Sequence, residues 1–486
     1  MQKKVIVIGA GISGLISAVY ARRSGFDTLV LEKAANPGGV STSWRRKGYL
    51  FEGSIHWLIG SSPKNPLHDI WTETGALQAN NPVFAKDPVY TLVDASGVRK
   101  EALYRDLRKL GDGPGLRSLR FHVACFRHFH TPIQDIPGLK CRYPRGFNPW
   151  EFVKMLPAVL ITPYLMSISA RHYLKRLKNK HLQDLLSAVV DPGINALSLI
   201  YTLSTFAAEG DSGYPAGGSL RMAQNMADTL VSLGGEIRYS TPAEQVLAQP
   251  DGTYAVKTAD ETFQVDAVII TMDARRAIDK LFPEPLQERW AKKLREKLTT
   301  EHCMFLGVGV KADLSKYPRA MQVVLDPPLE TAGRSYSLLN VNNYAREKDY
   351  APEGCSVITV LLGGESYAFW KAAREDGTYK EKKEAVIQAF LDRIIQYIPE
   401  IEGNVEVTDM ATPLTYERYC DTFEGSYMTH WVPRTDFLTA PIHYKKGLYF
   451  AGQRTAYSGG LPPAATSART AAQYLCRDFK VEFVSK

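Results

Sequence analysis

The first patterned stretch of the chain is an unbroken run of β-branched residues over positions 5–8. Such a run is typical of a strand that is buried on both faces of a parallel sheet. A glycine turn follows, and the apolar spacing of residues 15–21 predicts a helix that ends at Gly25. Residues 28–31 form a second apolar run. The N-terminal pattern therefore predicts a strand, a helix and a second strand of one parallel sheet.

The turn before the helix carries three glycines in the spacing G-x-G-x-x-G, and the second strand ends in an acid. Gly9 permits the tight turn, Gly11 lets a pyrophosphate approach the backbone, and Gly14 lets the helix pack closely on the strand. The helix N-terminus directs N–H groups and its positive dipole end at the phosphates. Glu32 is placed to accept hydrogen bonds from a ribose hydroxyl, which disfavours the 2′-phosphate of NADP. These features predict dinucleotide binding and leave NAD and FAD as alternatives.

The last patterned stretch, "LYFAGQRTAYSGGLPPAATSAR", has a similar order of elements. Residues 448–451 predict a short buried strand, Gly452 a turn, and Pro462 the opening of a small-residue helix over 463–472. A helix N-terminus at this place stabilises the negative charge that an isoalloxazine ring gains on reduction. An NAD enzyme needs no such second element. The two ends of the chain together therefore favour FAD.

Between these ends the pattern changes twice. Residues from about 65 to 210 show helical periodicity interrupted by prolines, which indicates an insertion. The α/β pattern resumes with a helix over 219–233, a strand over 236–239 and a buried strand over 265–270. Residues from about 285 to 425 mix strands with a helix. We expect this last region to belong to a second, substrate-binding layer.

Composition and charge narrow the class of protein. The 486 residues are 45% hydrophobic and 23% charged, a globular composition, and they exceed one compact core. The net charge of +8 is too small and too dispersed to indicate nucleic-acid binding. The six cysteines lack metal-ligand spacing, so we expect reduced thiols and no metal site. Only a strand and a glycine turn follow Lys4, so we expect no signal peptide and a cytoplasmic protein.

Residues 152–170 form the most apolar later segment, and arginines and lysines are concentrated over 171–180. Lys154 and two prolines interrupt the apolar segment, so we expect no transmembrane helix. An apolar segment followed by a basic one fits a peripheral membrane contact over residues 150–182. A helix that lines the substrate domain, followed by a solvated basic helix, fits the same pattern. The sequence leaves both interpretations open.

Several motifs together resemble one family. They are the first glycine turn with Glu32, the pair Gly38 and Gly39, and the elements "PAGG", "GGEI", "LYFAGQ" and "GGLPPAATSAR". These motifs resemble the phytoene desaturase, carotenoid isomerase and retinol saturase family of FAD-dependent oxidoreductases. The resemblance implies a deep apolar tunnel and peripheral attachment to membranes. The family often has "PGGG" where this chain has residues 457–460, "YSGG", which predicts a differently shaped flavin face.

The expected fold class is α/β, and the resemblance implies a glutathione-reductase-type, Rossmann-like FAD domain with a discontinuous α+β substrate domain. The FAD domain is expected over residues 1–64, 211–284 and 426–486, and the substrate domain over 65–210 and 285–425. The residues expected to bind FAD, with the backbone of Val246 at the adenine, are Gly9, Ala10, Gly11, Ser13, Gly14, Glu32, Lys33, Gly38, Gly39, Val40, Ser41, Val246, Gly452, Gly460, Leu461, Pro462 and Ala464.

The flavin carries the hydride, so the protein has to supply orientation and at most one proton carrier. His56 follows the loop that is expected to approach the flavin, and Tyr427 and His430 lie in an aromatic segment shortly before the flavin strand. These three residues are the candidate catalytic residues. A structural histidine at position 56 and ordinary core packing of the aromatic segment are the alternatives. The sequence contains no motif of a hydrolase or a phosphoryl-transfer enzyme.

The sequence therefore predicts an FAD-dependent oxidoreductase that acts on carbon–carbon double bonds of a hydrophobic isoprenoid or polyene-like small molecule, by saturation, desaturation or isomerisation. The alternatives are a flavin amine oxidase and a non-catalytic lipid-binding protein of the GDP-dissociation-inhibitor type. The expected partners are the hydrophobic substrate and, in one of the two interpretations of residues 150–182, a membrane surface. The sequence leaves open the substrate's identity, the redox direction, the electron partner and the oligomeric state.

Overall fold

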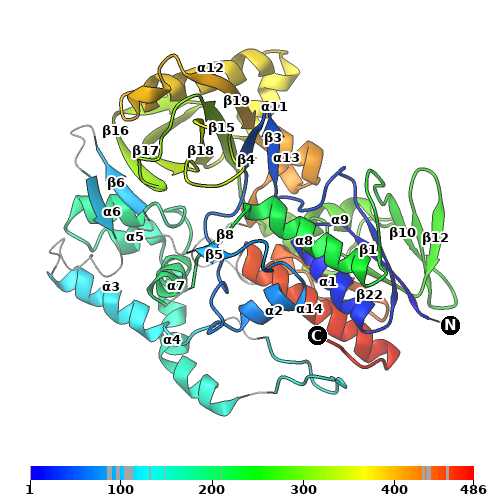
Figure 1. The fold of residues 1–486 in the computed structure, drawn as a ribbon. Helices are drawn as coiled ribbons and strands as arrows, with labels where there is room; N and C mark the ends of the chain where they lie inside the picture. The colour runs from blue at the N-terminus through cyan, green and yellow to red at the C-terminus, as the bar shows by residue number, and fades with distance from the viewer. Residues whose placement is uncertain are drawn as a thin grey trace.

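A computed structural model gives the arrangement of the chain (Figure 1). Figure 1 shows one sheet with its helices on the right, a second sheet at the top and a helical segment at the lower left. The residues that the structure describes are 2–84, 90–94, 99–102, 113–130, 133–146, 148–208, 211–429, 433, 439–455 and 459–486.

The first sheet has six strands in the order β21-β22-β13-β1-β2-β9, and the described pairings are parallel except β21 with β22. Val5 and Val7 of β1 pack on one face of the sheet, and Ile6 and Ile8 pack on the other. The prediction of a doubly buried strand is confirmed. The strands are β1 (Lys4–Ile8), β2 (Asp27–Leu31), β9 (Glu236–Arg238), β13 (Ala267–Ile270), β21 (His443–Lys445) and β22 (Leu448–Phe450).

Helices α1 (Ile12–Arg23), α8 (Gly218–Ser232) and α14 (Leu461–Phe479) share a core with one face of this sheet. The opposite face packs against a small antiparallel sheet and two helices: β10 (Gln245–Ala248), β11 (Tyr254–Lys257), β12 (Thr262–Val265), α9 (Ala274–Lys280) and α10 (Arg289–Lys297). Two predictions need correction. The strand expected over 265–270 is divided between β12 and β13, and α14 is longer than the expected 463–472.

The second sheet has seven strands in the order β19-β15-β18-β17-β16-β6-β7. Helices α11 (Tyr367–Glu375) and α12 (Tyr379–Ile394) share a hydrophobic core with one of its faces. The strands are β6 (Tyr90–Val93), β7 (Arg99–Ala102), β15 (Cys303–Val310), β16 (Ala320–Thr331), β17 (Arg334–Asn343), β18 (Ser356–Gly363) and β19 (Val405–Ala411).

The helical segment lies beside β6 and β16 and has its own core (Figure 1). No helix among the described residues is long and apolar enough to cross a membrane. The helices of the helical segment are α3 (Gly113–Cys125), α4 (Pro149–Ser167), α5 (Ala170–Leu174), α6 (Lys180–Leu186) and α7 (Ala196–Ala207). The remaining short elements are α2 (Leu67–Glu73), α13 (Pro413–Cys420), β3 (Ser43–Arg46), β4 (Tyr49–Glu52), β5 (Val83–Phe84), β8 (Tyr214–Pro215), β14 (Thr300–Glu301), β20 (Met428–Thr429) and the 3₁₀ turns Pro399–Ile401, Phe423–Gly425 and Gln453–Thr455.

Candidate active site

A cavity of about 1230 Å³ extends from the carboxyl ends of β1 and β2 to helices α4 and α7 and to the face of β16 and β17. Crevices at the carboxyl ends of parallel strands are the usual ligand sites of such sheets. Residues far apart in the sequence therefore meet along one wall. The predicted cofactor residues that line the cavity are Gly9, Gly11, Ser13, Glu32, Lys33, Gly38, Gly39, Val40, Ser41, Gly452, Gly460, Leu461, Pro462 and Ala464.

The glycine turn after β1 has the geometry that a pyrophosphate requires. Gly9 has a φ of 103°, which favours glycine, and its N–H donates to the carbonyl of Leu31. A side chain at Gly14 would overlap the carbonyl oxygen of Gly9, so α1 packs directly on the turn. The second glycine loop lies on the first, because the Gly38 N–H donates to the Ala10 carbonyl at 2.9 Å. Backbone, rather than bulky side chains, faces the cavity here.

Glu32 stands at the end of β2 with its carboxylate nearly buried. Its two oxygens accept hydrogen bonds from the N–H groups of Ala10 and Ala34 at 2.6 and 2.7 Å. Burial raises the pKa of Glu32, whereas these two backbone donors and the neighbouring Lys33 lower it. Each oxygen keeps a lone pair for a ribose hydroxyl, because a carboxylate oxygen accepts two hydrogen bonds.

Two serines lie in or next to the cofactor cradle, by which we mean the glycine turns at Gly9–Gly14 and Gly38–Gly39 together with Glu32. Their hydroxyl groups differ in hydrogen bonding. Ser13 donates its hydroxyl to the carbonyl of Ala464, which ties α1 to the first turn of α14. The buried hydroxyl of Ser41 has no hydrogen-bond partner among the described residues, although it lines the cavity. A buried polar atom of this kind is satisfied by a ligand or water. The residues present therefore fit a dinucleotide.

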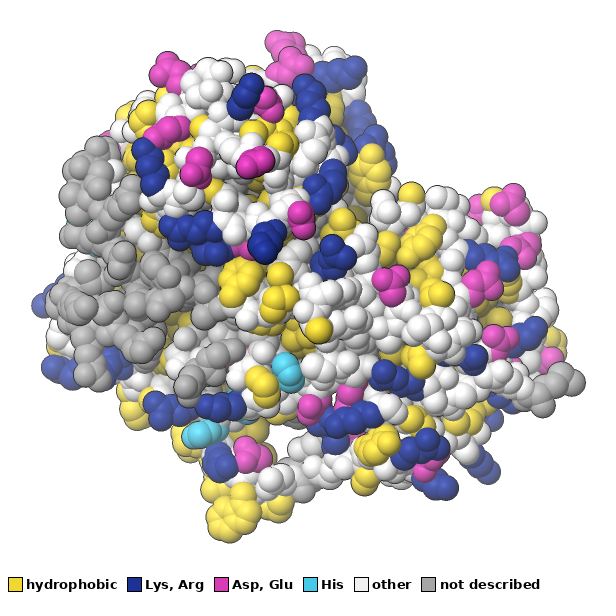
Figure 2. All heavy atoms as spheres, viewed as in Figure 1, with side chains coloured by type: hydrophobic (Ala, Val, Ile, Leu, Met, Phe, Trp, Pro, Cys, Tyr) yellow, Lys and Arg dark blue, Asp and Glu magenta, His cyan; other side chains and the backbone are white. Residues whose placement is uncertain are grey.

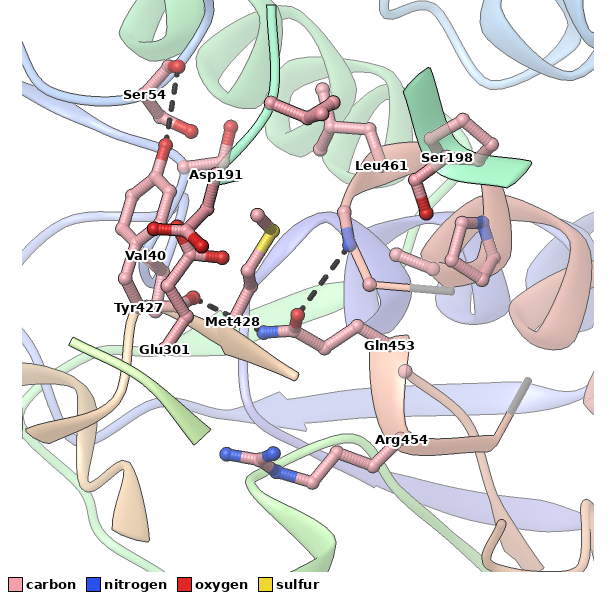
Figure 3. Close-up of a pocket in the computed structure, with 18 of the residues that line it drawn as sticks. Val40, Ser54, Asp191, Ser198, Glu301, Tyr427, Met428, Gln453, Arg454 and Leu461 are labelled. Carbon is pink, nitrogen blue, oxygen red and sulfur yellow. Dashed lines mark hydrogen bonds between the residues drawn. The ribbon is translucent and has the colours of Figure 1, made fainter. Parts of the chain in front are cut away.

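The start of α14 borders the cavity from the other side. Gly460 precedes the helix with a φ of 93°, and its N–H donates to Gln453 Oε1 at 3.4 Å. Pro462 and Pro463 carry no N–H, so Leu461 is the one residue among the first three that has an N–H to offer. The start of α14 therefore offers one N–H among these three residues, together with the positive end of the helix dipole. Figure 3 shows Gln453 between Tyr427 and this turn.

Val246 lies outside the cavity wall. Its side chain is buried against β11 and α9, and its N–H donates to the carbonyl of Leu281 at 2.8 Å. Pro242 and Ala243, a few residues earlier, do line the cavity. The contact between the Val246 backbone and an adenine stays a prediction.

A buried ion pair that was not predicted from the sequence joins three parts of the wall. The Arg454 guanidinium donates to Asp273 Oδ2 at 2.7 and 2.9 Å, and to the hydroxyls of Thr429 and Ser426 at 3.0 and 2.6 Å. Asp273 also accepts a hydrogen bond from the Arg275 N–H at the start of α9. The loops after β13 and β22 are thereby fixed to β20. The available signal was an acid, Asp273, a few residues after a buried strand and immediately before a helix.

The three candidate catalytic residues differ in whether the structure places them at the cavity. His56 and Tyr427 both line the cavity, and His430 lies outside the described residues. The Tyr427 hydroxyl donates to the carbonyl of Ser54 at 3.3 Å (Figure 3). Burial raises the pKa of Tyr427 well above its usual value, so the side chain stays a neutral donor. Glu301, which the sequence analysis did not select, also lines the cavity and faces Met428 across the β14–β20 pair.

Comparisons with known proteins also indicate a flavoprotein. A family model described as "Flavin containing amine oxidoreductase" matches residues 12–476. A prolycopene isomerase of Daucus carota is 23% identical over 98% of this chain and 80% of its own length. A lycopene-forming phytoene desaturase of Pseudescherichia vulneris is 22% identical over 99% of this chain and 100% of its own length. The solved cyclohexylamine oxidase of Brevibacterium oxydans has a similar fold, with a TM-score of 0.64 and 15% identity over 99% of this chain and 100% of that one.

Proposed function

The chain belongs to the family of flavin-containing amine oxidoreductases and is an FAD-dependent oxidoreductase, and from this premise we propose that it acts on carbon–carbon double bonds of a hydrophobic isoprenoid or polyene-like molecule. The observation that carries the proposal is the cavity that extends from the glycine turns and Glu32 to the helical segment. The curated relatives whose names refer to lycopene and prolycopene support this substrate class.

The far part of the cavity suits a long apolar ligand. Residues of α4 and α7 form much of its wall, and most of these side chains carry no charge. Such walls remove apolar ligand surface from water, which stabilises binding by about 25 cal/mol per Å². The hydrophobic or aromatic residues of this part of the wall include Phe129, Val159, Pro163, Met166, Val189, Val190, Ile194, Leu197 and Tyr201.

FAD, when bound, supplies the centre that accepts or donates a hydride. The glycine turns and Glu32 would hold the dinucleotide, and the start of α14 would lie at the ring. Val40, Met428 and Leu461 line the same part of the cavity and exclude water from it. Tyr427 positions the loop at Ser54 by its hydrogen bond. His56 and Glu301 are two of the side chains there that can hold a proton for a reacting carbon, and Asp191 is a third.

The exposed apolar side of α4 supports peripheral attachment to a membrane as part of this proposal. Trp150 and Leu160 are 74% and 77% exposed, and Figure 2 shows hydrophobic side chains with basic ones at the lower left, where α4 lies. Other residues of α4, such as Pro163 and Met166, line the cavity. A lipid-soluble substrate could therefore pass from the membrane directly into the cavity.

A spectroscopic titration of the purified protein tests the cofactor chemistry. We expect the visible bands of oxidised flavin, because the glycine turns and Glu32 fit a dinucleotide. Anaerobic bleaching by NADPH indicates saturation or isomerisation through reduced flavin. Bleaching by dithionite alone indicates desaturation or a different electron carrier. Colourless protein that takes up no FAD would contradict the proposal and support the lipid-binding alternative, and hydrogen peroxide release from an amine would support an amine oxidase.

A further inference from the structure

One arginine on the wall of the cavity has no acidic partner. Arg334 begins β17 and lines the cavity. Its Nε is buried without a hydrogen-bond partner among the described residues, and its Nη1 donates to the carbonyl of Glu365 at 3.3 Å. No acid in the described part of the chain forms an ion pair with this guanidinium. A charge that is partly removed from water is stabilised by an opposite charge, so this arginine offers a site for an anion.

The backbone after β18 holds the guanidinium in place. Gly364 has a φ of 114°, and a side chain there would overlap the guanidinium of Arg334. The Gly364 N–H donates to the carbonyl of His302 at 2.9 Å, which fixes this backbone in turn. The guanidinium therefore lies directly on the glycine and is anchored by the Glu365 carbonyl. An arginine that is already positioned loses little conformational freedom when it binds a ligand.

Tyr336 supplies a second donor two residues further along β17. Its side chain lines the cavity and is only 9% exposed. The hydroxyl is buried and has no hydrogen-bond partner among the described residues. Burial raises the pKa of Tyr336 to about 12, and the neighbouring Arg334 lowers it, so the hydroxyl keeps its proton at neutral pH. A buried hydroxyl of this kind is satisfied by a ligand or by water.

The strands leave room for a ligand beside this pair. The pairing of β17 with β18 covers residues 340–343 of β17, and the described pairing of residues 334–338 is with β16. The first part of β17 thus separates from β18. Gly363, near the end of β18, lines the cavity, and a side chain built there would meet no atom within 4 Å.

The donors of the pair decide which chemical group fits. Arg334 and Tyr336 together offer N–H and O–H donors and a single positive charge. A carboxylate accepts from both residues through its two oxygens and carries one negative charge. A carbonyl or a hydroxyl would leave the guanidinium charge uncompensated. A diphosphate would bring more negative charge than one arginine offsets, and Glu301 and Asp191 on the cavity wall disfavour it further.

We propose that Arg334 and Tyr336 bind a carboxylate group at one end of an otherwise apolar substrate. The proposal rests on the proposed function for the isoprenoid part of the ligand and adds that the substrate is an acid. Leu338 lines the cavity next along β17, and Asn340 donates to the carbonyl of Ala188, just after α6. The carbon chain therefore extends from the acid end along β17 towards the helical segment.

Binding of matched probes to the purified FAD-loaded protein tests this assignment. One pair is geranylgeranoic acid and its methyl ester, which has the same skeleton without the charge, and hexadecanoic acid and its methyl ester form a second pair without isoprenoid branches. Binding is followed by tryptophan fluorescence and the flavin spectrum at neutral pH, where the acids are ionised. We expect each acid to bind at least about tenfold more tightly than its ester, because hydrogen bonds to a charged group are the strong ones.

Three variants locate the preference for the acid. Arg334→Gln should abolish it, and Tyr336→Phe, which keeps the ring, should reduce it severalfold. Arg171→Gln is the matched control, because Arg171 of α5 also lines the cavity, and it should leave the preference unchanged. Flavin content and circular dichroism establish that the variants fold.

Equal affinity for acids and esters, binding of none of the four probes, or an unchanged preference in Arg334→Gln would overturn the proposal. A preference for hexadecanoic acid that depends on Arg334, without binding of either isoprenoid probe, would support the carboxylate site and contradict the proposed function alone. Conversion of isoprenoids by a protein that shows no preference for acids would contradict this inference alone.

Discussion

At the scale of single residues, the cofactor cradle depends on the close approach of α1 to the turn after β1. Replacing Gly14 with alanine places a methyl group against the Gly9 carbonyl and the Thr271 hydroxyl. We expect Gly14→Ala to lose about 1–3 kcal/mol of stability and most of its bound FAD, measured as the flavin-to-protein absorbance ratio. Gly146→Ala is the control, because a side chain there meets no atom within 4 Å. Full flavin content in Gly14→Ala would contradict this account of the turn.

Residues that share a local motif could be selected from the sequence, and their role in binding the cofactor stays a prediction. The glycine spacing and Glu32 lie within one βαβ unit, and all of these residues except Gly14 line the cavity. The pair of Asp273 and Arg454 was missed, because partners distant in the sequence meet only through strand order and register. No local spacing distinguishes these polar residues from surface ones.

At the scale of elements, α4 provides a direct test of membrane attachment. We expect Leu160→Asp to weaken binding to vesicles of mixed phosphatidylcholine and phosphatidylserine at least about tenfold, because it places a charge where an apolar side chain enters the lipid. Leu160 is highly exposed, so the fold should be unaffected. Val231→Asp, on the exposed side of α8, is the matched control. Equal cosedimentation of Leu160→Asp and the unaltered protein would contradict the attachment.

Elements with a strong periodic pattern were predicted closely. The expected helix over 219–233 is α8, and the strand over 28–31 is β2 within one residue. The C-terminal helix was underestimated, because residues 473–479 lack the small-residue composition that identified its first half. The strand expected over 265–270 is interrupted at its one charged residue, Asp266, whose side chain accepts from the Lys4 N–H.

At the scale of the whole molecule, three separate regions of the chain build one cavity. The six-stranded sheet presents the cofactor turns, the seven-stranded sheet closes one wall, and helices α4 and α7 close another. The sequence predicted two layers, and the family resemblance implied a tunnel. The position of the cavity follows from packing between segments, which no local pattern encodes. The proposed division into domains assigns these regions to an FAD domain and a substrate domain.

The measurement that tests the central claim most directly is product analysis by mass spectrometry and NMR. The FAD-loaded protein, oxidised in one series and reduced in another, is incubated without oxygen with isoprenoid acids, isoprenoid alcohols and polyenes. We predict a product that has gained or lost two hydrogens, or one of unchanged mass with altered double-bond geometry. Unchanged isoprenoids in both series, together with oxidation of an amine when oxygen is admitted, would contradict the account.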